Sequence, residues 1–179
     1  DAGGNAANVT AATGVSLSGT FTLRVAVAET DKMSDISYSM DGGNPLPLIM
    51  NRATGYFEQA ISTKALMDDT GHNVSVTIVS RAGLTTTINR PFRVDNTPPA
   101  VTVRSPVGSA QKGLVQIAVD VADATGITEV LVRIDGGAWK DMSVTKTPGR
   151  YAYKWQTAVP QNGEHSFEVR VTDSLQNRG

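Results

Sequence analysis

The stretch Gly113–Gly137, GLVQIAVDVADATGITEVLVRIDGG, decides the fold because the chain contains it twice. Residues Gly19–Gly43, GTFTLRVAVAETDKMSDISYSMDGG, align with it without a gap, each residue 94 positions earlier. An internal repeat of this kind shows that one structural unit is used twice. The sequence therefore predicts two domains of the same fold, residues 1–95 and 96–179.

Each copy consists of short alternating apolar runs separated by turn residues, a pattern typical of antiparallel β-sandwiches. The strands predicted for the first copy are Phe21–Ala28, Ile36–Met40, Leu46–Ile49, Tyr56–Ile61, Asn73–Ser80 and Thr85–Val94. Those of the second are Val101–Arg104, Val115–Val121, Glu129–Ile134, Trp139–Met142, Tyr151–Trp155 and His165–Thr172. Only residues 63–69 have helical composition, and we expect a single turn there.

Two further motifs organise the chain. Asp-Gly-Gly follows a predicted strand at Asp41–Gly43 and again at Asp135–Gly137, which indicates the same hairpin turn in both copies because glycine accepts positive φ. The segment between the copies, residues 94–100, contains Pro98-Pro99. Two prolines fix φ and keep the preceding residue extended, so the sequence predicts a short, stiff joint with the domains arranged end to end.

The ends of the chain repeat parts of its interior. Residues 1–5, DAGGN, resemble residues 173–177, DSLQN, which follow the last predicted strand. We therefore expect residues 1–7 to be the tail of a preceding repeat. We also expect the second domain to lack the counterpart of Thr85–Val94, which would leave an unpaired strand edge open to strand addition by a neighbour.

Composition excludes several classes of function. Lys and Arg number 16 and Asp and Glu 17, so the net charge of −1 gives no electrostatic footprint for nucleic acid or an anionic membrane. The absence of cysteine removes disulfides, thiolate metal sites and cysteine nucleophiles. No apolar run reaches the length of a membrane span. We therefore predict neither nucleic-acid binding nor membrane insertion.

The two histidines, His72 and His165, occupy equivalent places at the start of a strand. One histidine in each repeat cannot form a metal pair, and no partner base or nucleophile is suggested by spacing. We expect a structural role in which a ring nitrogen ties down the preceding loop. No catalytic or cofactor-binding residue is predicted.

Aspartates offer the oxygen ligands that calcium prefers. The candidates are Asp95, Asp120, Asp123, Asp135, Asp141 and Asp173. The dense acidic motif of repeats that bind calcium at their junctions is absent, so turn and strand-end roles are favoured. Calcium remains an alternative, with Asp95, Asp123 and Asp173 as its candidate ligands.

Aromatic residues are the candidates for interaction. Tyr151, Tyr153 and Trp155 alternate and so project from one face of a strand, as a sugar-binding platform if exposed or as core if buried. Their counterparts Phe57, Gln59 and Ile61 favour core for the two outer residues and an edge position for Tyr153. Trp139, beside its turn, could cap the hairpin or anchor an interface.

The run Asp120–Trp139, the run Gly163–Asp173 and the joint VDNTPP at residues 94–99 resemble bacterial Ig-like, fibronectin-III-like repeats. The first copy departs from that pattern, with Ser80 in place of Asp173 and Pro45 in place of Trp139. The resemblance implies two tandem Ig-like antiparallel β-sandwiches, and such repeats occur in tandem on cell-surface and secreted proteins. The Trp139 segment also resembles the Ig-like dimerisation domain of molybdenum-cofactor oxidoreductases and domains appended to calcineurin-like phosphoesterases, whose catalytic motifs are absent here.

Three hypotheses for function follow. The first is a non-catalytic extracellular spacer or adhesion module in a larger surface or secreted protein. The second is an accessory region of a secreted hydrolase that binds substrate or packs on a catalytic domain. The third is a dimerisation module that uses an open sheet edge or the Trp139 region. The expected partners are neighbouring Ig-like repeats or a catalytic domain of the same full-length chain, with carbohydrate or protein at the cell surface as further possibilities.

Overall fold

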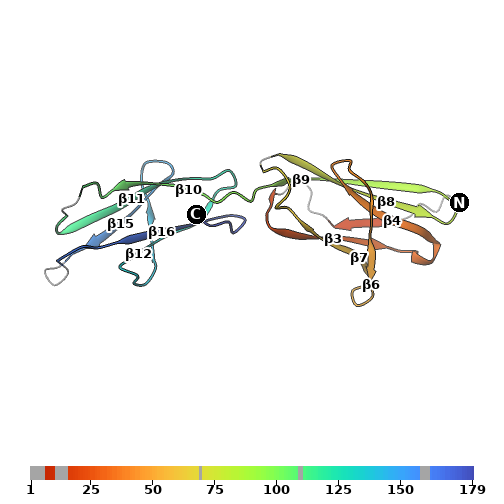
Figure 1. The fold of residues 1–179 in the computed structure, drawn as a ribbon, viewed down its shortest axis with the longest axis horizontal. Helices are drawn as coiled ribbons and strands as arrows, with labels where there is room; N and C mark the ends of the chain where they lie inside the picture. The colour runs from red at the N-terminus through yellow and green to blue at the C-terminus, as the bar shows by residue number, and fades with distance from the viewer. Residues whose placement is uncertain (1–6, 11–15, 69, 109–110, 158–161) are drawn as a thin grey trace. The chain divides into compact units, whose positions relative to one another are not determined.

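The computed structural model describes residues 7–10, 16–68, 70–108, 111–157 and 162–179 of the chain (Figure 1). The chain divides into two compact units, Asp1–Asn96 and Thr97–Gly179. Strands dominate both units, and the only helical element among the described residues is one 3₁₀ turn, η1 (Thr30–Lys32). The all-β prediction is confirmed, whereas the predicted tail at residues 1–7 lies almost wholly outside the described residues.

The first unit is a sandwich of two sheets. One sheet has the order β1-β3-β7-β6, with β1 (Ala7–Thr10), β3 (Thr20–Val27), β7 (Tyr56–Ser62) and β6 (Ile49–Asn51). The other has the order β2-β9-β8-β4-β5, with β2 (Ser16–Leu17), β9 (Thr85–Val94), β8 (Gly71–Ser80), β4 (Met33–Met40) and β5 (Leu46–Pro47). All pairs are antiparallel except β2 with β9.

The second unit repeats this architecture with fewer strands. One sheet has the order β10-β11-β15-β14, with β10 (Ala100–Ser105), β11 (Leu114–Ala122), β15 (Arg150–Gln156) and β14 (Ser143–Val144). The other has the order β13-β12-β16, with β13 (Lys140–Asp141), β12 (Ile127–Ile134) and β16 (Phe167–Asp173). Among the described residues β16 is thus an edge strand, whereas its counterpart β8 lies between β4 and β9.

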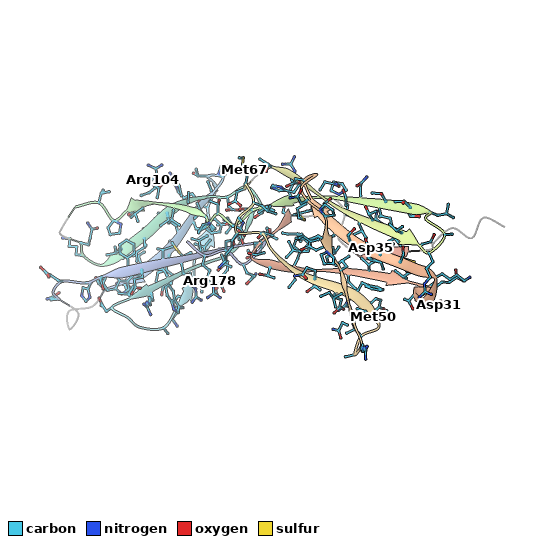
Figure 2. The ribbon with its side chains drawn as sticks, turned by 45° about the vertical axis from the view of Figure 1, so that its right-hand side comes forward. Asp31, Asp35, Met50, Met67, Arg104 and Arg178 are labelled. Atoms are coloured by element: carbon cyan, nitrogen blue, oxygen red, sulfur yellow. The ribbon has the colours of Figure 1, made fainter. Side chains whose placement is uncertain are left out.

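Strand alternation places an apolar row of each sheet between the layers, and the sticks in Figure 2 fill this space in each unit. The core of the first unit includes Leu23 and Val76, and that of the second includes Val119 and Val171, all fully buried. Each unit therefore has its own hydrophobic core.

The Asp-Gly-Gly motif forms the same tight turn in both units. The N–H of Gly43 donates to the carbonyl of Met40 at 2.8 Å, and that of Gly137 to Ile134 at 2.8 Å. Both central residues have positive φ, 49° and 73° at Asp41-Gly42 and 50° and 68° at Asp135-Gly136. This is the type I′ geometry, which aspartate tolerates and glycine accepts without strain.

Each predicted strand has a counterpart, with ends shifted by a few residues, but the predicted strand Leu46–Ile49 is divided into β5 and β6, which belong to different sheets. The short strands β1, β2 and β14 were not predicted. Residues 63–68 contain a hydrogen-bonded turn from the Leu66 N–H to the Thr63 carbonyl, as expected of this segment. β2 escaped prediction because two residues carry no periodicity, and its position depends on pairing with Arg93 and Val94.

Candidate functional site

His72 is held in a network of hydrogen bonds that starts at the Asp41 turn. Its Nδ1 lies 2.7 Å from Oδ2 of Asp41, and its Nε2 lies 2.8 Å from the carbonyl oxygen of Met67. Oδ1 of Asp41 accepts from the backbone N–H of Asn73 at 2.7 Å. A carbonyl and a carboxylate both accept hydrogen bonds, so these two contacts favour the imidazolium form of His72 with a proton on each ring nitrogen. The Thr70 hydroxyl lies 3.0 Å from the same Nε2. The predicted tie from the ring to the preceding loop is confirmed at Met67.

The charges of this pair shift both pKa values. Burial opposes the charge on His72, but the hydrogen bonds to Met67 and Asp41 outweigh it and raise the pKa of His72. Burial likewise acts to raise the pKa of Asp41, and the hydrogen bonds from His72 and Asn73 reverse this and lower it. The carboxylate and the imidazolium therefore stabilise each other across two strands.

The second unit repeats the Asp–His contact. His165 Nδ1 lies 2.6 Å from Oδ2 of Asp135, whose Oδ1 accepts from the Ser166 N–H at 2.9 Å. The Ser166 N–H and His165 lower the pKa of Asp135. The His165 side chain is 24% exposed, against 8% for His72. We call the two arrangements, Asp41–His72–Asn73 and Asp135–His165–Ser166, the turn clamps.

Trp139 contacts two arginines on the outer face of the β13-β12-β16 sheet. The guanidinium carbons of Arg133 and Arg170 each lie 4.7 Å from the centre of its ring. Arg133 also forms a two-pronged ion pair with Glu168, at 2.9 and 2.6 Å. The ring is half-buried, and its cation–π contacts join β12 to β16. These contacts fit the predicted role of Trp139 in capping the hairpin. An interface role for Trp139 stays a prediction.

The alternating aromatics of β15 face the interior to different degrees. Tyr151 and Tyr153 are half-buried and pack against the second core. Trp155, predicted to be core, is half-buried and lines a cavity, with its ring 4.9 Å from that of His165. β14 pairs only with Tyr151 and Ala152, so Tyr153 lies beyond the paired part of that side. A sugar platform formed by this row, and an interaction role for Tyr153, stay predictions.

The aspartates have structural contacts. Asp120 bridges Arg150 and Arg104, each with an oxygen at 2.6 Å, and these hydrogen bonds lower the pKa of Asp120 to about 2. Arg104 lies at the surface of the second unit (Figure 2). Asp141 is an exposed residue of β13, opposite Leu131.

The calcium candidates divide between the units. Asp123 accepts from the Thr125 N–H at 2.8 Å and from its hydroxyl at 2.9 Å, as in a turn held by its own side chain. Asp173 is fully buried and accepts from the N–H groups of Leu175 and Asn177, each at 2.8 Å. Carboxylate oxygens of Asp123 and Asp173 lie within 4.8 Å of each other. Asp95 follows β9 in the first unit, so a calcium site that uses all three stays a prediction.

One site was not predicted. Asn96, the last residue of the first unit, is bonded to Gly19, Thr63 and Asp68 of that unit. Its place in the VDNTPP joint was a signal, because an asparagine two residues before Pro98-Pro99 is well placed to fix the exit of the chain. Its partners were invisible because they lie 28 to 77 residues away in sequence.

These features fit a structural class of protein, and one family model matches part of the chain. Residues 99–169 match the family model described as "Bacterial Ig domain". The resemblance to bacterial Ig-like repeats is thereby confirmed, in the second unit by the family match itself. No curated protein matches the chain. Among the described residues, no helix is long and apolar enough to cross a membrane.

Several solved structures resemble this chain, and one of them matches with a TM-score above 0.5. The titin domains I67–I69 match at 10% identity over 98% of this chain and 63% of theirs, with a TM-score of 0.54. A bacterial ice-binding adhesin matches at 18% identity over 97% of this chain and 61% of its own, with a TM-score of 0.46. The endo-β-1,4-mannanase of Thermotoga petrophila matches at 14% identity over 53% of this chain, with a TM-score of 0.45. This chain spans only 20% of the mannanase and 20% of an engineered protein that also matches.

Proposed function

We propose that this chain is a non-catalytic structural part of a larger surface or secreted protein, in which its Ig-like domains act as a spacer or adhesion-related module. Its partners would be neighbouring Ig-like repeats or a catalytic domain of the same polypeptide, at the cell surface or outside the cell. The match to a bacterial Ig domain supports an extracellular module. The observation that carries the spacer role is the anchoring of Asn96.

Asn96 ties the exit of the first unit to its body through five hydrogen bonds. Its Oδ1 accepts from the Gly19 N–H at 2.9 Å and from the Thr63 hydroxyl at 2.8 Å. Its Nδ2 donates to the Thr63 carbonyl at 3.2 Å and to Asp68 Oδ1 at 3.0 Å. Its backbone N–H donates to the same Asp68 oxygen at 3.1 Å. A chain that leaves its domain through such an anchor cannot swivel at that point.

The linker continues this restraint. Pro98 and Pro99 follow two residues after the anchor, and their rings fix φ in the segment between β9 and β10. A spacer transmits position only if its joints resist bending, so the anchor and the two prolines serve one purpose. The turn clamps fit the spacer role, because their Asp–His contacts join β4 to β8 in the first unit and β12 to β16 in the second.

Small-angle X-ray scattering tests this proposal. We expect an elongated particle for the 179-residue chain, and a broader distribution of shapes for Asn96→Ala and for the double variant Pro98→Gly/Pro99→Gly. Asn44→Ala, at an exposed asparagine of the loop after β4, is the matched control and should scatter like the parent. A folded-back compact parent, or variants with the parent's distribution, would show that the joint is not a spacer.

A further inference from the structure

The ring of His72 is bonded to two residues that come shortly before β8. Its Nε2 lies 2.8 Å from the carbonyl oxygen of Met67 and 3.0 Å from the hydroxyl of Thr70. The Thr70 hydroxyl donates to the same Met67 carbonyl at 2.8 Å. When Nε2 carries a proton, the Met67 carbonyl therefore has two donors, the ring and the hydroxyl.

The residue after Met67 holds the exit of the first unit. Oδ1 of Asp68 accepts from the backbone N–H of Asn96 at 3.1 Å and from its Nδ2 at 3.0 Å. These are two of the five hydrogen bonds of the Asn96 anchor, and the other three have different partners. The contact of His72 and the contact of Asn96 are thus made by adjacent residues of one segment.

Among the described residues, the charged group that faces His72 is Asp41. Its Oδ2 lies 2.7 Å from Nδ1, and its charge acts on the ring. β9 presents the uncharged ring of Phe92, 5.7 Å from that of His72, while its neighbour Arg93 belongs to the exposed face of β9. The segment before β8 contributes the carbonyl and the hydroxyl described above. The ring of His72 therefore lies between one carboxylate and two neutral groups.

This asymmetry decides where the remaining proton lies when the imidazolium releases the other to water. A proton kept on Nε2 would set the lone pair of Nδ1 against the Asp41 carboxylate. A proton kept on Nδ1 sets the lone pair of Nε2 against a neutral carbonyl, beside a hydroxyl that can turn to donate to it. The second arrangement costs less, because a full charge repels a lone pair more strongly than a dipole does. Neutral His72 thus keeps Asp41, and the Met67 carbonyl loses the ring and the Thr70 hydroxyl together.

We propose that His72 is a pH-sensitive switch on the exit of the first unit, whose charged form holds Met67 and so keeps Asp68 against Asn96, and whose neutral form releases this segment. The pKa of His72 is raised above 6.5, so the segment is held at pH 6.5 and below and is released as pH rises through the folded pKa. The three other hydrogen bonds of Asn96 remain, so the exit loosens without unfolding. This inference does not depend on the spacer role.

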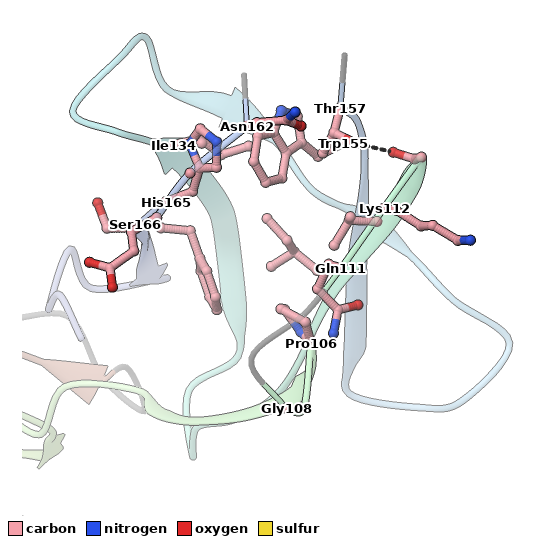
Figure 3. A pocket seen from close by; sticks show the side chains of 16 residues that line it. Pro106, Gly108, Gln111, Lys112, Ile134, Trp155, Thr157, Asn162, His165 and Ser166 are labelled. Carbon is pink, nitrogen blue, oxygen red and sulfur yellow. Dashed lines mark hydrogen bonds between the residues drawn. The ribbon is translucent and has the colours of Figure 1, made fainter. Parts of the chain in front are cut away.

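The second unit supplies a reference histidine. His165 has the same contact with an aspartate, Asp135, but its ring lies 4.9 Å from that of Trp155 (Figure 3). The residues at the place of Met67 lie outside the described part of the chain. Because Asn96 belongs to the first unit, titration of His165 should leave its hydrogen bonds unchanged.

Nuclear magnetic resonance of the 179-residue chain between about pH 5.5 and pH 8.5 tests the switch. The ring signals of His72 and His165 give their two midpoints. We expect the side-chain and backbone amide signals of Asn96 to titrate with the midpoint of His72. Hydrogen exchange at the Asn96 N–H, divided by the intrinsic rate at each pH, should rise about 3- to 10-fold, as for the loss of one hydrogen bond. The Gly19 N–H, which donates to Asn96 without Asp68, should show no such rise.

Two variants separate the switch from a general effect of pH. In Asp41→Asn the new amide donates to Nδ1, so neutral His72 keeps its Nε2 proton for Met67. The Asn96 N–H should then stay protected at pH 8.5. Asp135→Asn, the same change in the second unit, should titrate at Asn96 like the parent. Circular dichroism verifies that both variants are folded.

Three results would overturn the proposal. The first is a set of Asn96 signals that do not follow the midpoint of His72. The second is an equal rise in exchange at Gly19 and Asn96, since the whole anchor would then open. The third is the same loss of protection at high pH in Asp41→Asn as in the parent. The first two are measured on the parent chain and so do not depend on the folding of a variant.

Discussion

Replacing Asp41 by asparagine tests whether the turn clamp of the first unit is an ion pair. Asparagine keeps Oδ1 for the Asn73 N–H and tolerates the left-handed φ of 49° at this position, so the change is confined to Oδ2, where an amide donor replaces the charged acceptor that faces Nδ1 of His72. A hydrogen bond between charged groups contributes about 1.5–3 kcal/mol. Because the Asp41 side chain is 42% exposed and screened by solvent, we expect a loss of about 1–2 kcal/mol at pH 6.

The loss should depend on pH in a defined direction. The folded pKa of His72 is raised above its ordinary value of 6.5, so the stability it contributes is fully present below pH 6.5 and disappears as pH rises through the folded pKa. The pKa of Asp41 is lowered, so its contribution is present above its ordinary value of 3.8 and is lost as pH falls through the folded pKa. At about pH 9 neutral His72 keeps its Nε2 proton for Met67, and Nδ1 accepts from the new amide. The variant should then lie within about 0.5 kcal/mol of the parent.

Urea unfolding measures this difference. Trp139 and Trp155 both lie in the second unit, so tryptophan emission reports that unit, and the change in circular dichroism without a change in emission reports the first. The matched control is Asp135→Asn, whose clamp is more exposed and should lose less at pH 6. An equal loss for Asp41→Asn at pH 6 and pH 9 would refute the imidazolium assignment, and so would no loss at either pH.

Other expected outcomes concern the carboxylates and the cores. The pKa of Asp120 is lowered to about 2, so the stability that its carboxylate contributes is present above pH 3.8 and is lost as the pH falls toward 2. Asp120→Asn should therefore flatten the fall in stability of the second unit between about pH 4 and pH 2, measured by tryptophan-monitored unfolding. An unchanged slope would contradict this. Asp173→Ala should destabilise the second unit by about 3 kcal/mol or more, since the N–H groups of Leu175 and Asn177 lose their acceptor, with Asp173→Asn as a milder control. Leu23→Ala in the first unit and Ile117→Ala in the second should each cost about 2–5 kcal/mol, because both side chains are almost completely buried in their own core. Urea unfolding measures both losses, and a loss below about 1 kcal/mol at either position would contradict this.

Local pattern predicted most of the fold. The type I′ turns at Asp41 and Asp135 followed from glycine chemistry, and the long strands followed from alternation over five or more residues. Trp155 was predicted to be core from its counterpart Ile61, but burial depends on the strand that covers a position, and no described strand covers Trp155.

Contacts that join distant segments could not be predicted. The position of His72 was noticed, but its partner Asp41 is 31 residues away and is set by the register of β4 on β8. The contacts of Trp139 with Arg133 and Arg170 depend on the path of the hairpin after β12. Asn96 needed three segments of the first unit to be in place. In each case the residue type was visible in the sequence and its partner was a product of the tertiary fold.

The edge strand β16 also bears on how this polypeptide folds. While the chain is unfolded, β9 has two acceptors of matching shape, β8 in its own unit and the edge of β16 in the next. Only four residues separate β8 from β9, whereas 72 residues separate β9 from β16, so the entropy of loop closure favours the local hairpin. During synthesis β8 also emerges first and pairs with β9 before β16 exists. The order of the repeats along the chain thus protects it from exchanging strands between its own domains.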